Sequence, residues 1–594
     1  MEIDDWPNLV AMFLSQAGRR ADRPFLWEKV DGAYRSMSWG EAARQVGALA
    51  AALRAHGLKP GDRVILLSAN SPRWAIADFA IMAAGGVTVP AYTTNTVANH
   101  EHLLSDSGAT MAIVSTAALA RPFLEAGRRV KSLKRVIAME APDGIDTGRV
   151  TVSRWDVALE EGAADGPDVL QAAEALPRDG LACLIYTSGT GGPPKGVMLS
   201  HRAILANCVG AHDVLAELGL EDEVFLSFLP LSHAYEHTAG LMFPVSIGAE
   251  IWFAERIETL STNLLEARPT IMTAVPRLYE IMRERIMKTV ARDGGLRAKL
   301  FWMAVELGRK RYEAPGTLGL RERLADRLVE KLVRDKFRGR FGGRLKALVS
   351  GGAPLAYEVG LFFSTLGLRL LQGYGQTEAA PVIAVNRCTR IKLRTVGPPL
   401  KHVELRIADD GEILVRGPLL MDGYWKLARL SAETLRDGWL HTGDIGVIDH
   451  DGYLQITDRK KDIIVISGGD TISPQHIENR LALEPEIDAA MVVGDNRPHL
   501  VAIVVPAGSF IAEWASHHGK SADLCALADD PAFRTAISRA VDRANADLSQ
   551  VERVKRFVVA DEPFTIENGM MTPTMKPRRH AINQRWGATL AGLY

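Results

Sequence analysis

The sequence has few cysteines, almost no net charge and no long apolar run. Its 594 residues include only four cysteines, and no two of them have the spacing of a metal-binding pair: Cys183, Cys208, Cys388 and Cys525. They are predicted to be buried thiols in a reducing compartment. A formal net charge of −1 gives no reason to expect a nucleic acid as a partner.

No segment has the composition of a membrane span or of a signal peptide. The most apolar run, residues 79–92, is shorter than a span and is interrupted by Gly85, Gly86 and Pro90. The first residues, MEIDDWPNLVAMFL, are acidic where a signal peptide is basic. We therefore expect a cytoplasmic enzyme, with any membrane contact peripheral and at the inner face.

The larger part of the chain alternates short apolar runs with helical patterns, which predicts an α/β fold with doubly wound sheets. The expected strands lie within RVILLSAN (63–70), VTVPAY (87–92), MAIVST (111–116), ACLIYT (182–187) and LKALVSGG (345–352). Farther on, residues 403–417 and 445–458 each place two alternating runs around an Asp-Gly turn, which predicts hairpins of a β-rich subdomain.

A charged, polar run at residues 458–462 separates the last hairpin from a smaller mixed α+β stretch. A chain of this length is expected to form at least two domains. We predict a large N-terminal domain over residues 1–460 and a small C-terminal domain over residues 461–594.

The stretch YTSGTGGPPKGVMLSH (186–201) has the composition of a phosphate-binding loop. Its glycines let backbone N–H groups approach phosphate oxygens, its hydroxyls donate to the same oxygens, and Lys195 supplies positive charge. The pattern GxxxxGK[ST] does not fit, because Lys195 precedes Gly196 and a strand, not a helix, is expected to follow. The alternative is an exposed Gly/Pro turn.

This loop resembles the phosphate loop of the adenylate-forming superfamily, which includes acyl-CoA synthetases, luciferases and peptide-synthetase adenylation domains. Gly191 stands where a second threonine is common, which removes one hydroxyl donor. The resemblance implies that ATP is bound by Thr187, Ser188, Gly189, Thr190 and Lys195.

Two further glycine-containing segments are similar to the nucleotide-binding segments of the same family. They are GGAP, with Gly351, Gly352 and Ala353, and QGYGQTE, with Gln372, Gly373, Tyr374, Gly375, Gln376, Thr377 and Glu378. By this similarity Tyr374 stacks on adenine and Thr377 contacts the α-phosphate. Glu378 and Thr187 bind Mg²⁺, a cation that takes carboxylate oxygens together with substrate phosphates.

The resemblance extends through the second half of the chain. It implies that Asp444 and Arg459 contact the ribose, that Lys461 is the hinge, and that Ser467, Gly468 and Gly469 line the coenzyme A tunnel. Without the family pattern, Asp444 would read as a turn residue and residues 459–461 as a solvated linker. Sequence alone separates a hinge from a linker poorly.

Lys576 lies in NGMMTPTMKPRR (568–579), which out of context is a basic exposed tail. Its spacing resembles that of the catalytic lysine of the family. The chemistry calls for such a group, because a carboxylate must attack the α-phosphate of ATP and both are anionic. A lysine between them offsets the repulsion and stabilises charge that develops in the transition state.

The stretch FLPLSHAYEH (228–237) is most similar to long-chain fatty acyl-CoA synthetases, which implies that His233 and Tyr235 border the acyl channel. The same residues contain His233-x-x-Glu236-His237, an inverted zinc-peptidase pattern. A zinc metallopeptidase is therefore a remote alternative. His237 could equally be a histidine that only fills space.

The predicted reaction uses ATP, Mg²⁺ and coenzyme A to convert a long-chain fatty acid into an acyl-adenylate and then an acyl-CoA. The alternatives are an acyl-AMP ligase that stops after the first step and a ligase for another carboxylic acid or for a carrier-protein thiol. Chain length and oligomeric state stay open.

Residues 309–346 carry thirteen basic and five acidic residues, with leucines at 320, 324, 328 and 332. The favoured interpretation is a surface helix that packs its apolar stripe on the sheet. The alternative is a face that contacts anionic lipid, where long-chain acids accumulate.

Overall fold

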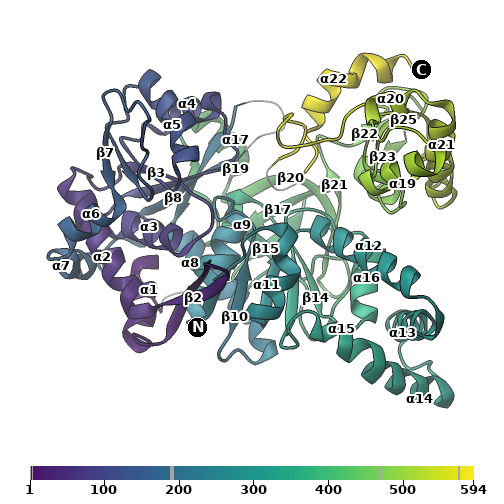
Figure 1. Ribbon diagram of the computed structural model, residues 1–594, viewed down its shortest axis with the longest axis horizontal. Helices are drawn as coiled ribbons and strands as arrows, with labels where there is room; N and C mark the ends of the chain where they lie inside the picture. Colours follow the sequence, from purple (N-terminus) through teal and green to yellow (C-terminus); the bar gives the residue numbers. More distant parts are fainter. Residues whose placement is uncertain (1, 3–4, 188–192, 469, 573–575) are drawn as a thin grey trace.

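The computed structural model describes residues 2, 5–187, 193–468, 470–572 and 576–594. Two eight-stranded sheets, a five-stranded sheet and a smaller C-terminal domain make up the molecule (Figure 1). This architecture confirms the predicted fold class of doubly wound sheets, a β-rich subdomain and an α+β C-terminal domain.

The first large sheet carries the predicted phosphate loop. Its strands are parallel from β8 to β7, whereas β9 and β18 run antiparallel at one edge. Their order is β18 (Gly423–Tyr424), β9 (Lys195–Ser200), β8 (Leu181–Thr187), β4 (Val87–Ala91), β3 (Arg63–Leu67), β5 (Met111–Val114), β6 (Arg135–Ala138) and β7 (Thr151–Arg154).

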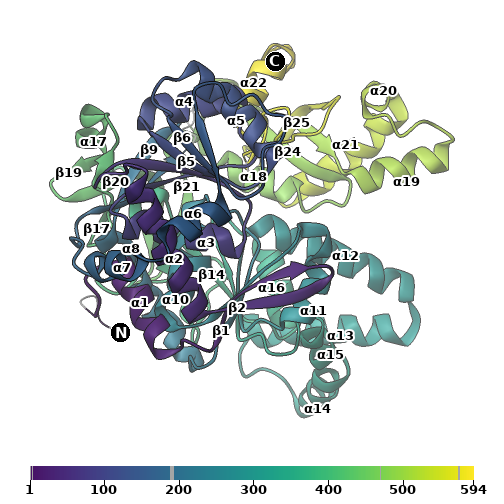
Figure 2. The same cartoon turned by 60° about the vertical axis from the view of Figure 1, so that its left-hand side comes forward.

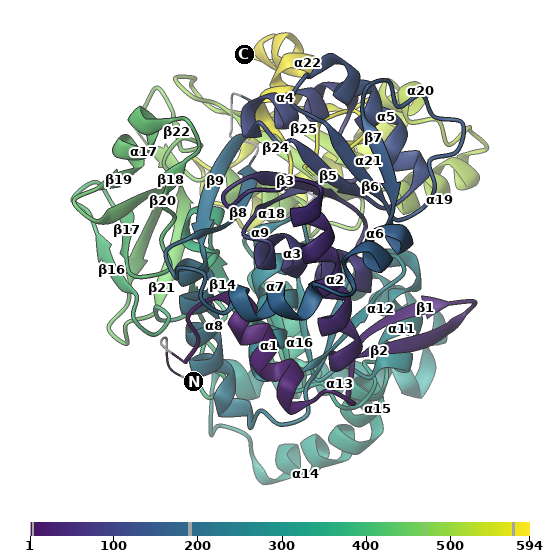
Figure 3. The same ribbon diagram turned by 90° about the vertical axis from the view of Figure 1, so that its left-hand side faces the viewer.

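Helices cover both faces of this sheet, which is why its central strands are apolar throughout. One face packs against α4 (Val97–Ser107) and α5 (Ala117–Arg129). The other packs against α2 (Trp39–Ala55) and α3 (Pro72–Ala83), which lie in front of β3 and β8 in Figure 3. The remaining helices of this part are α1 (Leu9–Arg19), α6 (Trp155–Gly162) and α7 (Gly166–Ala173).

The second large sheet is parallel except at its two edges, where β15 and β2 run antiparallel to their neighbours. Its order is β15 (Val382–Val385), β14 (Leu370–Gly375), β13 (Ala347–Ser350), β12 (Ile271–Ala274), β10 (Val224–Ser227), β11 (Glu250–Phe253), β1 (Pro24–Val30) and β2 (Ala33–Ser38).

The helices of the second sheet again form two layers. The layer toward the first sheet contains α8 (His201–Leu215), η2 (His237–Met242) and α10 (Phe243–Ile247). The outer layer contains α11 (Leu260–Ala267), α12 (Pro276–Asp293), α13 (Gly295–Glu313), α15 (Asp335–Gly339) and α16 (Tyr357–Thr365). The remaining helical segments of this part are η1 (Ala216–Leu218), α9 (Ala234–Glu236), η3 (Ile257–Thr259), α14 (Leu320–Val329), η4 (Glu330–Arg334) and η5 (Thr377–Ala379).

The third sheet confirms both predicted hairpins. One consists of β16 (Glu404–Ile407) and β17 (Glu412–Arg416), and the other of β20 (Trp439–Ile448) and β21 (Leu454–Arg459). The strand β19 (Leu435–Arg436) pairs with β20 at one edge and follows α17 (Ala428–Thr434).

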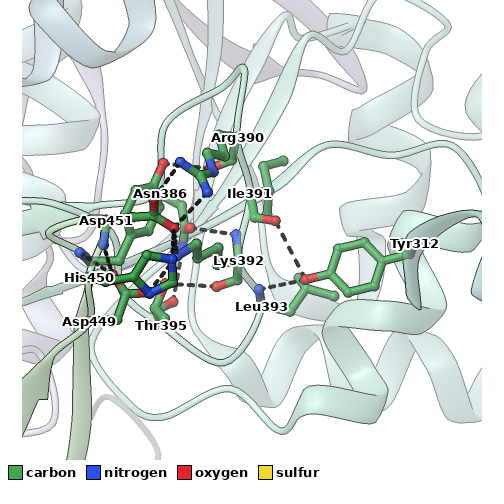
Figure 4. A network of polar contacts seen from close by, with 11 residues as sticks. Tyr312, Asn386, Arg390, Ile391, Lys392, Leu393, Thr395, Asp449, His450 and Asp451 are labelled. Atoms are coloured by element: carbon green, nitrogen blue, oxygen red, sulfur yellow. Dashed lines mark hydrogen bonds and ion pairs between the residues drawn. The ribbon is translucent and has the colours of Figure 1, made fainter. Parts of the chain in front are cut away.

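A polar network fixes the loop between β15 and β16 against the rest of the molecule (Figure 4). The ammonium group of Lys392 lies 2.5 Å from carboxylate oxygens of Asp449 and Asp451 in the β20–β21 turn. On the other side, the N–H of Leu393 donates to the Tyr312 hydroxyl of α13 over 2.9 Å. The loop is therefore held between the third sheet and an outer helix.

The C-terminal domain contains a three-stranded sheet, a short two-stranded ribbon and several helices. The strands are β24 (Ile487–Val493), β25 (Leu500–Pro506) and β26 (Val554–Val559), with the ribbon of β22 (Ile464–Val465) and β23 (Thr471–Ile472). The helices are α18 (Pro474–Leu481), α19 (Gly508–His518), α20 (Leu524–Ala528), α21 (Pro531–Ala546) and α22 (Arg579–Ala591).

The C-terminal domain contacts the rest of the molecule along α12 (Figure 2). Arg277 of α12 forms an ion pair with Asp488 of β24. Farther along the same helix, the Ser509 hydroxyl donates to the Glu284 carboxylate over 3.2 Å. Leu483 adds an apolar contact with the core beneath α12.

The structure corrects one expectation about the cysteines. Cys183, Cys208 and Cys388 are buried, but Cys525 is exposed because it lies on the short surface helix α20. Within the described parts of the chain, none of the helices combines the length and the apolar character that crossing a bilayer requires.

Candidate functional site

A cavity of about 2240 Å³ lies where both large sheets, the third sheet and the C-terminal domain meet. The carboxyl ends of β8, β13 and β14 open onto it, the place where ligands bind in open α/β sheets. Its wall includes the following predicted site residues: Thr187, Lys195, His233, Tyr235, Gly351, Gly352, Ala353, Gln372, Gly373, Tyr374, Gly375, Gln376, Thr377, Glu378, Asp444, Arg459, Lys461 and Lys576.

Some predicted site residues are not part of this wall. Ser188, Gly189, Thr190 and Gly469 lie outside the described residues. Ser467 and Gly468 belong to the turn between β22 and β23, where the Ser467 N–H donates to the Arg497 carbonyl over 2.9 Å. They do not line the cavity in this arrangement of the two domains, so their link to coenzyme A stays a prediction.

The β8–β9 hairpin sets the two ends of the phosphate loop. Thr187, the last residue of β8, pairs directly with Lys195, the first residue of β9. His102 Nε2 donates to the carbonyl oxygen of Pro194 over 2.8 Å, which ties the end of the loop to α4. A hydroxyl from one strand and an ammonium group from its neighbour therefore stand at the same edge of the sheet.

Tyr424 joins this hairpin to Glu378. As part of β18 it pairs with Val197 of β9, and the Lys195 ammonium lies 5.3 Å from the centre of its ring. The Tyr424 hydroxyl donates to Glu378 Oε1 over 2.7 Å, and this bond aims the carboxylate. Sequence reasoning missed Tyr424, because the segment DGYW around it contains no pattern typical of phosphate or metal binding.

Glu378 and Thr187 have the chemistry of a magnesium site. Only one carboxylate oxygen of Glu378 is used by Tyr424, so the other can bind a cation. Both residues line the cavity. A hard cation that keeps phosphate oxygens and waters among its ligands needs just one or two such protein groups. The residues present therefore fit Mg²⁺.

Gly351 gives Tyr235 its place at the cavity wall. A Cβ atom on Gly351 would lie 2.8 Å from the Tyr235 ring, so a larger residue there would displace the tyrosine. The Tyr235 hydroxyl donates to the Val349 carbonyl over 3.1 Å, at the end of β13. The ring is thus fixed beside the loop that follows this strand.

Asp444 is held by two neighbours. The Tyr374 hydroxyl donates to its Oδ2 over 2.6 Å, and Arg459 Nε lies 3.2 Å from its Oδ1. Burial and the nearby Asp444 charge raise the pKa of Tyr374 well above its usual value, so the phenol stays a donor. A carboxylate offers about four acceptor positions. Asp444 therefore keeps capacity for further donors such as sugar hydroxyls.

Lys576 reaches the cavity from the C-terminal domain. Its N–H donates to the Thr572 hydroxyl over 3.0 Å, and three residues later Arg579 pairs with the buried Glu478. Burial and, after it, the positive charge of Arg459 lower the pKa of Lys576 to about 8, while Asp444 opposes this shift. Burial and the Lys576 charge also lower the pKa of His233 to about 4, so His233 is neutral at pH 7.

Two residues of the zinc-peptidase pattern, Glu236 and His237, are held by other buried side chains, and Nδ1 of the third, His233, accepts the Tyr235 N–H over 3.1 Å. Glu236 accepts hydroxyl hydrogen bonds from Ser227 (2.7 Å) and Thr273 (2.8 Å), and burial raises its pKa to about 7. His237 Nε2 lies 2.8 Å from Asp78 Oδ2. No group of three or more His, Cys, Asp or Glu side chains in the described residues is arranged to hold a metal ion. Nothing here supports a zinc site.

Family comparisons match almost the whole chain. Residues 13–425 match the AMP-binding enzyme family, and residues 461–594 match the AMP-binding enzyme C-terminal domain. The chain belongs to the AMP-binding enzyme family. The resemblance to adenylate-forming enzymes is thus confirmed at the level of the family, while the role of each site residue stays a prediction.

Relatives within the AMP-binding enzyme family cover this chain over most of its length. The long-chain-fatty-acid–CoA ligase FadD15 of Mycobacterium bovis is 34% identical over 100% of this chain and 98% of that protein. The peroxisomal long chain acyl-CoA synthetase 6 of Arabidopsis thaliana is 31% identical over 95% of this chain and 83% of that protein.

Solved structures at lower identity share the fold. The A domain of a carboxylic acid reductase from Segniliparus rugosus, in complex with AMP and a co-purified carboxylic acid, has a TM-score of 0.78 at 22% identity, covering 99% of this chain and 94% of that one. The anthranilate CoA ligase AuaEII, in complex with anthranoyl-AMP, has a TM-score of 0.72 at 21% identity and full coverage of both chains.

The neighbours of Lys576 predict how its pKa responds to substitution. Removing the positive charge in Arg459→Met should raise the pKa of Lys576 above its value of about 8, because the ammonium form is then less disfavoured. Removing the negative charge in Asp444→Asn should lower it. Lysines of the ligand-free protein can be methylated with ¹³C and titrated by NMR, with Lys576→Arg to assign the resonance. A Lys576 resonance that titrates above pH 10 in all variants would contradict this electrostatic description of the site.

Proposed function

We propose that the protein activates a long-chain fatty acid with ATP and transfers the acyl group to coenzyme A. The products are acyl-CoA, AMP and pyrophosphate. The observation that carries this proposal is the single cavity, which combines Thr187, Lys195, Glu378 and Asp444 with Lys576 from the C-terminal domain. Relatives at 34% and 31% identity that are named as long-chain acyl-CoA ligases support it.

An apolar section of the same cavity wall supports an acyl substrate. Its residues come from α8, β10, η2, α10, β12, β15 and the loop after β15: Ala211, Val214, Leu215, Phe225, Ala239, Phe243, Ile271, Val385, Leu393 and Val396. A hydrocarbon chain that leaves water for such a surface gains free energy in proportion to its buried area. The polar network around Lys392 holds the loop with Leu393 and Val396 in place.

In the first step, a carboxylate oxygen of the fatty acid attacks the α-phosphorus of ATP, and pyrophosphate leaves. The Lys576 ammonium lies between the two anions and stabilises the charge of the transition state. Lys195 and the hydroxyl of Thr187 hold phosphate oxygens, while Asp444 and Arg459 hold the ribose. Tyr374 stacks on adenine, and His233 and Tyr235 border the carboxylate end of the acyl channel.

Mg²⁺ would be held by Glu378 and Thr187 together with phosphate oxygens. When bound, it supplies positive charge that neutralises the triphosphate. Tyr424 acts through Glu378, because its hydroxyl fixes the direction of the carboxylate.

In the second step, the C-terminal domain rotates about Lys461, withdraws Lys576 and brings the segment of Ser467, Gly468 and Gly469 to the cavity. The thiolate of coenzyme A attacks the acyl carbon, and AMP leaves with one former carboxylate oxygen. The rotation fits a pocket that serves two chemistries, since each step needs different residues. It requires that the contacts of α12 with Asp488 and Ser509 break.

The enzyme is proposed to work in the cytoplasm, with peripheral contact at the inner membrane face where its substrate accumulates. This location is a separate part of the proposal, and the reaction does not depend on it.

The two half-reactions should respond differently to the loss of Lys576. Lys576→Ala should slow ATP-dependent pyrophosphate release by roughly 10²–10³-fold, because an electrostatic contact with the transition state is lost. Thioester formation from supplied acyl-adenylate should stay within a few-fold of wild type. Pyrophosphate release and acyl-CoA should be measured over a panel of carboxylic acids, with and without coenzyme A. The exposed Lys555 of β26 offers a matched control, Lys555→Ala.

Three outcomes of these assays would overturn parts of the proposal. An equal loss in both half-reactions would remove the assigned role of Lys576. Pyrophosphate release without any coenzyme A-dependent AMP release would indicate an acyl-AMP ligase. A preference for short or aromatic acids would indicate a ligase for another carboxylic acid.

The hydrogen bond from Tyr424 to Glu378 predicts a magnesium phenotype. Tyr424→Phe should raise the Mg²⁺ concentration for half-maximal activity by about 10–100-fold, as is usual when a group that orients a metal ligand is removed. Tyr453→Phe is the control, because its hydroxyl, in the β20–β21 turn, donates to the Arg390 carbonyl of the β15–β16 loop and not to Glu378. An unchanged Mg²⁺ dependence in Tyr424→Phe would show that Glu378 does not need this bond.

A further inference from the structure

The outer face of α14 and of η4, which continues it, carries a row of exposed leucines. Leu320, Leu324, Leu328 and Leu332 are 80%, 66%, 52% and 41% exposed, and their four-residue spacing places them side by side on one helical face. This corrects the sequence-based expectation that the stripe packs on the sheet. Val329 of α14, Arg334 of η4 and Phe337 of α15 face inward instead, and all three are buried.

The inward face is fully engaged, which fixes the orientation of the helix. Arg334 donates to the carbonyl oxygens of Thr365 and Ala304 over 2.8 and 2.9 Å. Val329 packs with Ala304 and Leu307 of α13. The segment 320–339 therefore cannot roll to bury its leucines without breaking these contacts. In all three ribbon views α14 lies at the edge of the molecule (Figures 1 to 3).

Charge on this helix is sorted between its two faces. The acidic residues pair inward or along the helix: Glu322 with Lys310, Asp326 with Arg334, and Glu330 with Arg338, each at 2.7 Å. Arg323, Arg327 and Lys331 form a row beside the leucines and have no ion-pair partner among the described residues. The outer face is thus apolar along one line and positively charged along the next.

We propose that this surface, made of the leucine row with Arg323, Arg327 and Lys331, binds the protein to an anionic lipid bilayer. Leucines with flanking Lys and Arg are the pattern of a helix that lies in the plane of a membrane interface. Unpaired cations attract anionic headgroups, and each contributes about fivefold to binding. A second copy of this chain fits less well, because a two-fold contact with antiparallel helices would face one basic row with another.

This surface goes beyond the proposed reaction and can be tested without it. The full-length protein should be sedimented, with no ATP or fatty acid present, with vesicles of phosphatidylcholine alone and of phosphatidylcholine with about a third phosphatidylglycerol. We expect binding to the anionic vesicles that weakens as salt rises, and little binding to the neutral ones.

Two variants remove the two components of the surface. Leu324→Ser/Leu328→Ser and Arg327→Glu/Lys331→Glu should each lower the partition coefficient for anionic vesicles at least tenfold. The matched controls Leu265→Ser, at a 55% exposed position of α11, and Arg534→Glu/Arg539→Glu, at exposed positions of α21, should bind like wild type. All variants should keep wild-type pyrophosphate release with a detergent-dispersed fatty acid, so failure of lipid binding and failure of the proposed reaction are distinguishable.

Other outcomes would overturn the proposal. Binding that is equal for neutral and anionic vesicles, or unchanged in both surface variants, would exclude this surface as the lipid-binding site. A dimer in light scattering that Leu324→Ser/Leu328→Ser dissolves would show that a second copy covers the leucines instead.

Discussion

The ammonium group of Lys576 belongs to one domain, and the cavity that it completes belongs to the other. The proposed first step depends on the entry of the Lys576 side chain into this cavity. Two contact sets produce it: the pair of Arg579 with Glu478 fixes the Lys576 loop on its own domain, and α12 holds that domain through Asp488 and Ser509. This position is electrostatically unfavourable for the Lys576 ammonium group. Lys576 is partly withdrawn from water and stands near Arg459, which is why its pKa is lowered to about 8.

Anionic substrates would offset this unfavourable environment of the Lys576 ammonium group. A bound triphosphate and carboxylate would favour the ammonium form further, so substrate binding would raise the pKa of Lys576 above its value of about 8. In the wall of the same cavity, Tyr424 connects Lys195 and Glu378 into one unit on the β8–β9–β18 edge. The edge strand of the first sheet, β18, thereby connects the Glu378 carboxylate to the strand that follows the phosphate loop. The apolar section belongs to the wall of the same cavity, which is why we propose that one cavity takes both a nucleotide and an acyl chain.

Much of this could be predicted from sequence. The strands around 63–70, 87–92 and 182–187 and both Asp-Gly hairpins formed as expected, because local patterning and turn chemistry agree with the fold. Motif residues far apart in sequence also line one cavity. Tyr424 was missed because its role depends on strand pairing between β18 and β9, which no local pattern encodes. The leucine row was misread because periodicity gives the apolar face of a helix but not what covers it. Cys525 was wrongly predicted to be buried. Cysteine is buried in most proteins, but this general tendency does not reveal that Cys525 lies on the short surface helix α20.

The most direct measurement follows the oxygen atoms of the acid. A fatty acid labelled with ¹⁸O in both carboxylate positions should be incubated with the protein, ATP, Mg²⁺ and coenzyme A, and the products analysed by mass spectrometry. If a carboxylate oxygen attacks the α-phosphorus at this site, each AMP carries one ¹⁸O and the acyl-CoA keeps the other. Unlabelled AMP, or ADP in its place, would contradict the account.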